Sequence, residues 1–436
     1  MKAYILDSGI RISPFNDPPG RAFVLNRRAE ERCQEILKRH GLEVVPIQSY
    51  DEIKDTEFFL LMDYVYFSPH CFHLFYKSVL RHRESRTIAL RSNAQIEMAS
   101  PMQDLRILPS QEQGTPPLVA FDLYYIQDPS FHPDKLREIP AEEIPVKMRT
   151  IQVPPPFYVR VKELVRIGMS KTYCTHLKHW THIYLLNFAA LTALPFEWFP
   201  RRLPWLLWRV LTAFSLNRFR IMRRLFVKGK HCSIHPTAVV EASVLGNNVS
   251  IGAHAVVRGS CLGNNVRLLE AAKVYGSIIG DNSELAWNSI VNMSVLYPRS
   301  CTGIPGVQTA MLGEEAFVSS MVLPLDVKFQ GGYVSVRHNG RTIRTNLTTL
   351  GPCFGHRVRV GAGVIINSGR EIPNDIDILP DPGGMLSRIP DSLVPGHSYI
   401  VKGGTLVDAS PGISNHASDQ PTGTDFSARN ASSKDN

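Results

Sequence analysis

The sequence has few cysteines, and no spacing among them that would hold a fold together. Its seven cysteines are an odd number, lie far apart and include no C-x-x-C pair. A disulfide framework or a zinc ribbon needs cysteines at characteristic spacings, so neither is indicated. A chain of 436 residues can bury a large core without such links. We therefore expect two or three domains in a reducing compartment.

Long apolar runs are also absent. Asp7 and Arg11 interrupt the region where a signal peptide would need an apolar core. The apolar run 183–196 contains Asn187 and Pro195 and is shorter than the roughly 20 residues that a membrane-spanning helix needs. We expect a cytoplasmic protein without a membrane span.

Acidic residues are nearly missing from one segment. Residues 155–230 hold 14 Lys and Arg residues against only Glu163 and Glu197, a net charge of +12. The rest of the chain has a net charge of −3, so the overall +9 comes from this segment. Its basic residues alternate with large apolar and aromatic ones, including four of the five Trp residues. Nucleic-acid-binding arms rarely have this composition, so we expect no nucleic-acid partner.

Within this segment, apolar positions recur at helical spacing from Leu203 onward, with the arginines mostly on the other face. Such a helix can lie at the inner membrane surface, with Trp at headgroup depth and Arg facing anionic lipid. Alternatively, it is a linker that packs on the chain's own domains, with Arg stems over apolar surface. The membrane interpretation assigns contacts to Trp180, Trp198, Trp205, Trp208, Arg220, Arg223 and Arg224.

The region after this segment has a strong repeat. From Ile234 to Val291 an aliphatic residue recurs every five to six positions, and the period resumes from Phe354 to Ile372. Stacked coils of a parallel β-helix require this period, and Gly or Asn is expected at corners with positive φ. Between the two runs, Asn339-Gly340 predicts a type I′ hairpin at about 331–347. We expect the β-helix to cover 231–408 and the polar tail 409–436 to be disordered.

The N-terminal part alternates between strand and helix patterns. "AYILDSG" predicts a first strand, a helical pattern follows, and "EFFLLMDYVYFSP" predicts a further apolar strand. This order favours an α/β sheet over residues 1–150. The basic segment 151–230 is then expected to be an amphipathic helical region between the α/β domain and the β-helix.

The coils from about 234 to 300, the hairpin "VRHNGRTIRT" and the coil "LGPCFGHRVRVGAGVIINSG" resemble the bifunctional sugar-1-phosphate nucleotidyltransferase and acetyltransferase family, which includes N-acetylglucosamine-1-phosphate uridyltransferase. The resemblance implies a left-handed β-helix, a homotrimer and a nucleotidyltransferase-like N-terminal domain. It also implies a sugar phosphate or nucleotide sugar as substrate and acyl-CoA as a donor, in the synthesis of cell-envelope precursors.

The same resemblance assigns residues to a nucleotide site. Gly9 and Arg11 correspond to a shortened phosphate-binding loop, Arg21 to a Lys of the family, and Asp63 to the Asp that holds Mg²⁺. Backbone N–H groups and cations would stabilise the charge at the attacked phosphate. The loop has fewer glycines than the family's loop, and an Arg has a different donor geometry from a Lys.

The acyl-transfer site departs from the family. The His that acts there as general base should lie near 301–315, where this chain has Gly306 and no His. His254 and His356 of the coils, and His338 of the hairpin, are the alternative bases. Two functions therefore stay open: a transferase at the membrane surface, or a trimeric scaffold or sugar-nucleotide-binding protein in which both sites have decayed.

Overall fold

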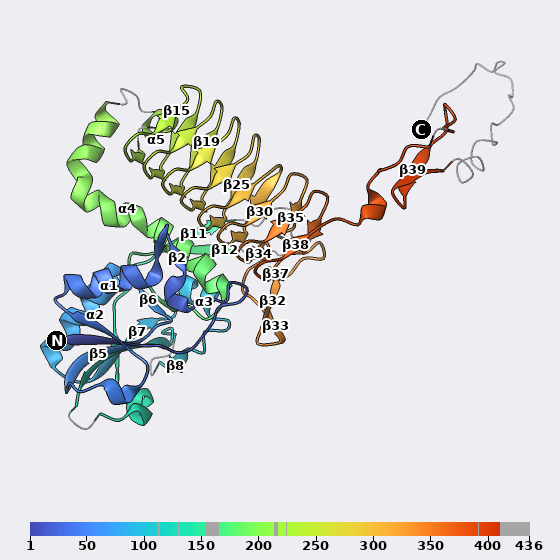
Figure 1. The fold of residues 1–436 in the computed structure, drawn as a ribbon. Coiled ribbons are helices and arrows are strands. Elements are labelled where there is room, and N and C mark those ends of the chain that lie inside the picture. Colours follow the sequence, from blue (N-terminus) through green and yellow to red (C-terminus); the bar gives the residue numbers. More distant parts are fainter. Residues whose placement is uncertain are drawn as a thin grey trace, which may run out of the picture. The chain divides into compact units, whose positions relative to one another are not determined.

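The structure is a computed structural model that describes residues 1–110, 114–128, 131–153, 165–212, 217–223, 225–390 and 392–409. The chain forms two compact units, Met1–Ile378 and Leu379–Asn436. The first unit contains a mixed α/β sheet, a long helix and stacked parallel strands that are consistent with a β-helix (Figure 1). The structure therefore shows the two main parts that the sequence predicts, an N-terminal α/β sheet and C-terminal stacked parallel strands.

The α/β part is built on one mixed sheet with strand order β10-β7-β9-β5-β1-β4, and β8 pairs with β9. β1 is parallel to β4 and β5, whereas β9 is antiparallel to β5 and β7. The carboxyl ends of β1, β4 and β5 therefore meet at one edge. The bounds are β1 Lys2–Leu6, β4 Glu43–Ile47, β5 Glu57–Met62, β7 Arg86–Arg91, β8 Arg106–Leu108, β9 Leu118–Gln127 and β10 Ala141–Glu143.

Both faces of this sheet are covered. Phe59 and Leu61 of β5 lie in the core that also holds residues of α1 (Ala29–Arg39) and α2 (Pro69–His82). Phe58 and Leu60 point to a second core, which includes Leu136 of the 3-10 helix η3 (Pro133–Glu138). Because both faces are buried, β5 is apolar along its length instead of alternating.

The expectation of helix from residue 151 onward is wrong for its first part. β11 (Arg149–Val153) and β12 (Val165–Met169) form an antiparallel pair, and β13 (Cys174–His176) pairs with β6 (Val65–Phe67). Strand β12 alternates as a strand does, but its pairing and that of β13 depend on tertiary contacts that the local pattern does not reveal. The shorter elements of this part are η1 Pro19–Arg21, β2 Phe23–Val24, β3 Arg27–Arg28, η2 Tyr50–Glu52 and α3 Ala94–Ala99.

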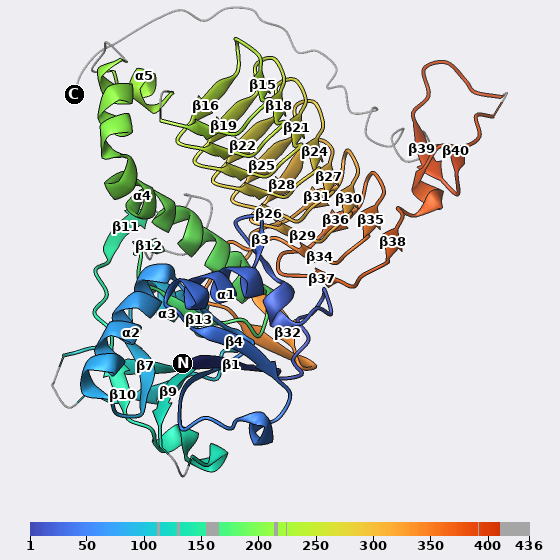
Figure 2. The same ribbon diagram turned by 60° about the vertical axis from the view of Figure 1, so that its left-hand side comes forward.

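The long helix α4 (Trp180–Leu211) has two environments, and the short α5 (Arg218–Met222) follows it. In the first half, Ile183, Leu186 and Ala190 are buried. Near the other end, Trp208 and Leu211 are about two-thirds exposed, at 66% and 70%. Figure 2 shows α4 bending beyond its buried half, in a stretch that contains three prolines, which lack the N–H of a helical hydrogen bond. Among the described residues, no helix is both long and apolar enough to cross a membrane.

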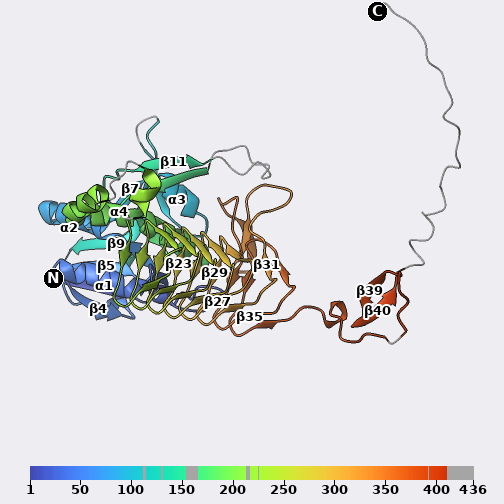
Figure 3. The same ribbon diagram turned by 90° about the horizontal axis from the view of Figure 1, so that it is seen from above.

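The β-helix has three faces of parallel strands that stack coil on coil (Figure 3). Leu262 lies between Leu245 of the preceding coil and Ile279 of the next, in a column of buried aliphatic side chains. The first face comprises β14 Val227–Lys228, β17 Val244–Leu245, β20 Cys261–Leu262, β23 Ile278–Ile279, β26 Val295–Leu296, β29 Met311–Leu312, β34 Cys353–Phe354 and β37 Glu371–Ile372. The second comprises β15 Ser233–Ile234, β18 Ser250–Ile251, β21 Arg267–Leu268, β24 Glu284–Leu285, β27 Cys301–Thr302, β30 Phe317–Val318, β35 Arg359–Val360 and β38 Asp377–Ile378. The third comprises β16 Val239–Glu241, β19 Val256–Arg258, β22 Lys273–Tyr275, β25 Ile290–Asn292 and β28 Gly306–Gln308, with the separate pair β31 Leu323–Pro324 and β36 Ile365–Ile366.

Asn and Gly have different tasks in the coils. Asn248, Asn265 and Asn282 adopt positive φ at successive corners, as expected. Gly246 and Gly263, in contrast, do not adopt positive φ. A Cβ on Gly246 would lie 2.5 Å from the carbonyl oxygen of Gly263, so this glycine is required by the close approach of the next coil.

The hairpin is confirmed, but the predicted end of the β-helix is too late. β32 (Ser335–His338) and β33 (Arg341–Arg344) flank Asn339 and Gly340, both with positive φ. The stacked strands end at Ile378, and the second unit contains η4 (Pro382–Gly384) and the antiparallel pair β39 (Tyr399–Lys402) and β40 (Thr405–Asp408). After 378 the aliphatic period is lost in a Pro- and Gly-rich stretch, and Pro cannot donate to a ladder. Residues 410–436, where disorder is predicted, lie outside the described part.

Candidate functional site

A cavity of about 430 Å³ lies where the parallel strands β1, β4 and β5 end. In open α/β sheets, ligands bind outside the carboxyl ends of the strands, so this is the natural place for a site. The polar side chains that line it are Asp7, Glu30, Gln34, Lys38, Gln48 and Asp63. Pro18 and Gly20 form part of its wall.

Two carboxylates follow directly after strands at this edge. Asp63 Oδ1 accepts hydrogen bonds from the backbone N–H of Ser8 (3.2 Å) and from Ser8 Oγ (2.5 Å). Burial raises the pKa of Asp63 and the charge of Asp7 adds to the shift, while Ser8 and Arg11 oppose it. Asp7 Oδ1 accepts from the N–H of Gly9 at 2.8 Å. Oδ2 of each carboxylate accepts no hydrogen bond from the described residues, so both retain an oxygen for a ligand.

The expected phosphate-binding loop is not arranged to bind a phosphate. The N–H groups of Ser8 and Gly9 donate to Asp63 and Asp7, and the N–H of Ile10 donates to Ser8 Oγ at 3.3 Å. A phosphate cradle needs such N–H groups to converge on the ligand instead. The correspondence of Gly9 with a phosphate-binding loop is therefore not supported.

The two arginines assigned to the nucleotide site are exposed. Arg11 donates to the carbonyl oxygen of Ile10, and neither Arg11 nor Arg21 lines the cavity. The only cationic side chain in the lining is Lys38 of α1. Glu30, Gln34 and Lys38 recur every four residues on that helix, a spacing that could have identified them as one polar face.

A divalent cation fits this donor set in one way. Within the described residues, no group of three or more His, Cys, Asp and Glu side chains could hold a metal. Mg²⁺ is commonly held by one or two carboxylates, with phosphate and water oxygens completing its shell. Asp7 and Asp63 both line the cavity, so they are the two carboxylates that would hold such an ion. The sequence analysis identified Asp63 but missed Asp7.

His356, the first alternative base, belongs to a contact between the β-helix and the α/β part of the first unit. Its Nδ1 accepts from the N–H of Glu314 at 2.9 Å, so Nε2 carries the proton and donates to Asp17 Oδ2 at 3.0 Å. The ring is buried and lies 5.1 Å from that of Phe15, between centroids. With no lone pair left on either nitrogen, His356 is not arranged to accept a proton from a substrate.

The other two candidate bases, His254 and His338, are not arranged for catalysis. His254 is exposed at a corner with positive φ, and its backbone N–H donates to Thr237. His338 packs edge-on against His179, 5.4 Å between ring centroids. At Gly306, a Cβ would lie 2.1 Å from the carbonyl oxygen of Ile290, so a His cannot occupy that place without rearrangement.

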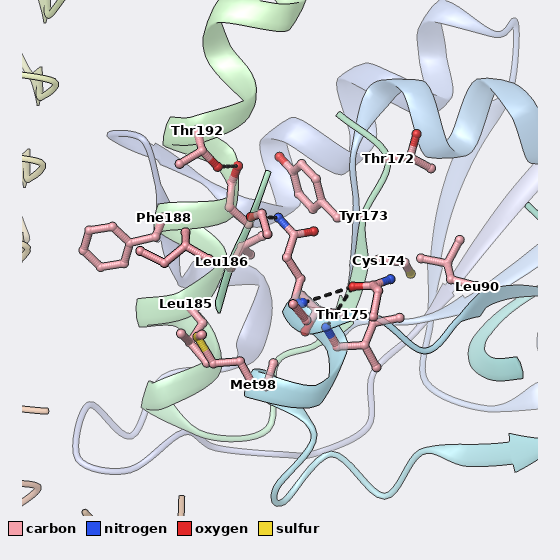
Figure 4. A pocket seen from close by; sticks show the side chains of 18 of the residues that line it. Leu90, Met98, Thr172, Tyr173, Cys174, Thr175, Leu185, Leu186, Phe188 and Thr192 are labelled. Carbon is pink, nitrogen blue, oxygen red and sulfur yellow. Dashed lines mark hydrogen bonds between the residues drawn. The ribbon is translucent and has the colours of Figure 1, made fainter. Parts of the chain in front are cut away.

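A second, apolar cavity of about 90 Å³ lies between α3, β12 and the buried half of α4 (Figure 4). Polar groups in its wall bond to one another: Gln103 Nε2 donates to Thr175 Oγ1 at 2.9 Å, and Gln95 Nε2 donates to the Gly168 carbonyl at 3.0 Å. Its surface offers little to orient a polar substrate.

The residues assigned to the membrane surface differ in their exposure. Trp180 is fully buried and its Nε1 donates to Glu371 Oε1 at 2.9 Å, so its expected place at headgroup depth is wrong. Trp208, Arg220 and Arg223 are exposed. Trp198 and Trp205 lie in α4, but their side chains are not described, and Arg224 lies outside the described residues.

Comparison with known proteins does not assign the chain to a family. No protein-family model matches the chain, and no curated protein sequence matches it significantly.

Proposed function

We propose that the cavity at the ends of β1, β4 and β5 binds a nucleotide sugar or sugar phosphate through a divalent cation, in a protein similar to the sugar-nucleotide transferases. The observation that supports this most is the pair Asp7 and Asp63, which lines a cavity of about 430 Å³ at the carboxyl edge of the sheet. Charged phosphates and two carboxylates repel each other, so the ligand needs a cation between them.

The chain's own groups have distinct tasks in this proposal. Asp7 and Asp63 would hold Mg²⁺, which neutralises phosphate charge when bound. Ser8 orients the Asp63 carboxylate by donating to its Oδ1. Lys38 places a positive charge in the lining, while Gln34 and Gln48 offer amide groups to sugar or base.

The alternative is a binding protein or scaffold without transfer activity, and a specific observation favours it. The N–H groups that would stabilise an attacked phosphate already donate within the loop. One experiment separates the possibilities: the melting temperature is followed with UDP-sugars and sugar 1-phosphates, with and without Mg²⁺, and pyrophosphate release is assayed in parallel with UTP. A Mg²⁺-dependent rise with pyrophosphate release indicates a transferase, and a rise alone indicates a binder. No rise with any compound contradicts the proposed site.

The β-helix is proposed to be left-handed and to associate as a homotrimer, as in the resembled family. Ile290, Leu323 and Ile365 support an association surface, because these large side chains are exposed on strands β25, β31 and β36. Light scattering tests this: a trimer mass is expected at micromolar concentration, and a monodisperse monomer contradicts it. An acyl-CoA site in these coils has no base among the histidines discussed above.

The exposed end of α4 supports a peripheral position at the inner face of the membrane. Trp208 and Leu211 are about two-thirds exposed, and Arg220 and Arg223 follow on α5 and just after it. Exposed apolar and basic side chains together suit an anionic lipid surface. Co-sedimentation with anionic vesicles at low salt should therefore exceed that with neutral vesicles, and equal sedimentation contradicts the proposal.

A further inference from the structure

The loop between β1 and α1 touches both the candidate cavity and the β-helix. Pro18 and Gly20 line the cavity, while Asp17, the residue before Pro18, accepts the hydrogen bond of His356 Nε2 at 3.0 Å. This loop therefore forms part of the cavity wall on one side. On its other side it contacts a coil residue that lies 339 positions later in the sequence.

Aromatic packing and backbone contacts hold the middle of this loop on the coils. The Phe15 ring stacks on that of Tyr297, with centroids 5.2 Å apart, and is buried. Asn374 Nδ2 donates to the carbonyl oxygen of Phe15 at 2.6 Å, and Asn374 Oδ1 accepts from the N–H of His356 at 2.7 Å. The coil thus holds both the backbone of the loop and the imidazole that binds Asp17.

Glu371 forms a second contact, on the neighbouring part of the loop. Its Oε2 accepts from Ser13 Oγ at 2.7 Å, and its Oε1 accepts from His179 Nε2 and Trp180 Nε1. Burial alone would raise the pKa of Glu371, but the hydrogen bonds from His179, Ser13 and Trp180 outweigh it, so the pKa is lowered and the group stays charged. A charged acceptor makes these hydrogen bonds strong.

The cavity side of the loop has little room to adapt. A Cβ on Gly20 would lie 3.1 Å from both Cβ and Oε2 of Glu30, another residue of the lining, so Gly20 is packed closely against α1. A shift of Asp17 and Pro18 would therefore change the shape of the cavity wall instead of being absorbed by free space.

From these contacts we infer that the β-helix coil from 353 to 374 positions the cavity loop, and that ligand binding in the cavity is coupled to this coil. His356 and Glu371 are then positioning residues, acting through Asp17 and Ser13. The inference rests on the proposed function for its ligand, but not for the loop contact itself. Coupling of this kind is reciprocal: if the coil favours ligand binding, the ligand must stabilise the docked coil.

The test uses the full-length chain with Ser13→Ala and Asp17→Ala combined, because these changes leave the β-helix residues in place. Arg357→Ala is the matched control, since Arg357 lies beside His356 but pairs with the exposed Asp375. Hydrogen exchange of segments 8–21 and 353–374 is measured with and without a UDP-sugar and Mg²⁺, together with ligand affinity and melting temperature.

We expect faster exchange of 8–21 in the ligand-free double variant and a loss of affinity of roughly tenfold or more, as is typical of coupled sites. Ligand should protect 353–374 in the wild type and in Arg357→Ala but not in the double variant. If the double variant has a lower melting temperature but normal affinity and normal ligand-induced protection, the contact is only structural and the inference is overturned. If the wild type binds no UDP-sugar, the proposed function fails. The inference is then tested by hydrogen exchange of 8–21 without ligand. Wild-type exchange rates in the double variant would overturn it.

Discussion

The α/β part and the β-helix use their polar side chains differently. In the coils, Asn248 donates to Asn265 and Asn265 to Asn282, each 17 residues on, so these amides serve the stacking itself. In the α/β part, Asp7 and Asp63 keep an oxygen that no described residue occupies, and both face a cavity. A ligand can use only groups that the fold has not already used. The difference supports our proposal that the α/β part binds the ligand and that the β-helix serves as its support.

The largest expected effect is on the stability of the coils. Leu285 is fully buried in the aliphatic column, whereas Glu284 beside it points outward. Leu285→Ala should lower the free energy of unfolding by about 2–5 kcal/mol, because it leaves a cavity that coils cannot close. Glu284→Ala is the control and should change it by about 0.5 kcal/mol or less. Equal effects of the two variants in denaturant unfolding would contradict the assignment of Leu285 to the core.

The next effect concerns binding and leaves stability nearly unchanged. Asp63→Asn keeps the acceptor for Ser8 but removes the charge that a cation needs. Mg²⁺-dependent affinity for a UDP-sugar should fall by roughly tenfold to a hundredfold or more, since loss of an outer-shell partner alone costs that much. Asp104→Asn is the control, because Asp104 pairs with Lys178 outside the cavity lining. Calorimetric titration showing the same affinity for both variants would exclude Asp63 as a ligand.

A pH effect should arise from two buried histidines, His176 at the end of β13 and His182 in the first turn of α4. Burial lowers the pKa of His176 to about 4 and that of His182 to about 3, where the charge of His179 contributes further to the shift at His182. Unfolded histidines titrate near 6.5, so between about pH 6.5 and 4 the unfolded state binds more protons. The free energy of unfolding should therefore fall as pH is lowered from 7.5 to 5.

His182→Gln should reduce this dependence, because one of the two buried groups is then absent. His132→Gln is the matched control, since His132 is exposed. The slope of melting temperature against pH measures the effect, and an unchanged slope in His182→Gln would contradict it.

A smaller effect is expected at the exposed end of the long helix. Reversal of Arg220 and Arg223 to Glu should weaken co-sedimentation with anionic vesicles at low salt, because each basic residue near such a surface contributes about 1 kcal/mol. Reversal of the exposed Lys273 and Arg341 of the β-helix changes the net charge equally and is the control. Equal loss in both variants would indicate a general effect of net charge.

The smallest effect is expected at His254. Its corner has a φ of 58°, which Asn tolerates, and its imidazole lies in solvent. His254→Asn should change the free energy of unfolding by less than about 0.5 kcal/mol and leave any turnover unaltered. A loss of acyl transfer in this variant would restore His254 as a base.

What the sequence revealed was local and periodic. The aliphatic column could be predicted because each coil repeats the same spacing, and Asn339-Gly340 determines its own turn. The burial of Trp180 could not be predicted, because its hydrogen-bond partner Glu371 lies 191 residues away in the sequence. The lining of the cavity could likewise be predicted only in part. Asp63 follows an obvious strand, but Glu30 and Lys38 line the cavity only because α1 packs against β4 and β6.

The most direct test of the central claim is a crystal of the full-length protein soaked with a UDP-sugar and Mn²⁺, which replaces Mg²⁺ and has an anomalous signal. The account predicts an anomalous peak between the carboxylates of Asp7 and Asp63, with nucleotide density in the cavity at the ends of β1, β4 and β5. Nucleotide density elsewhere, or an ordered cavity with neither metal nor nucleotide at saturating concentration, would contradict it.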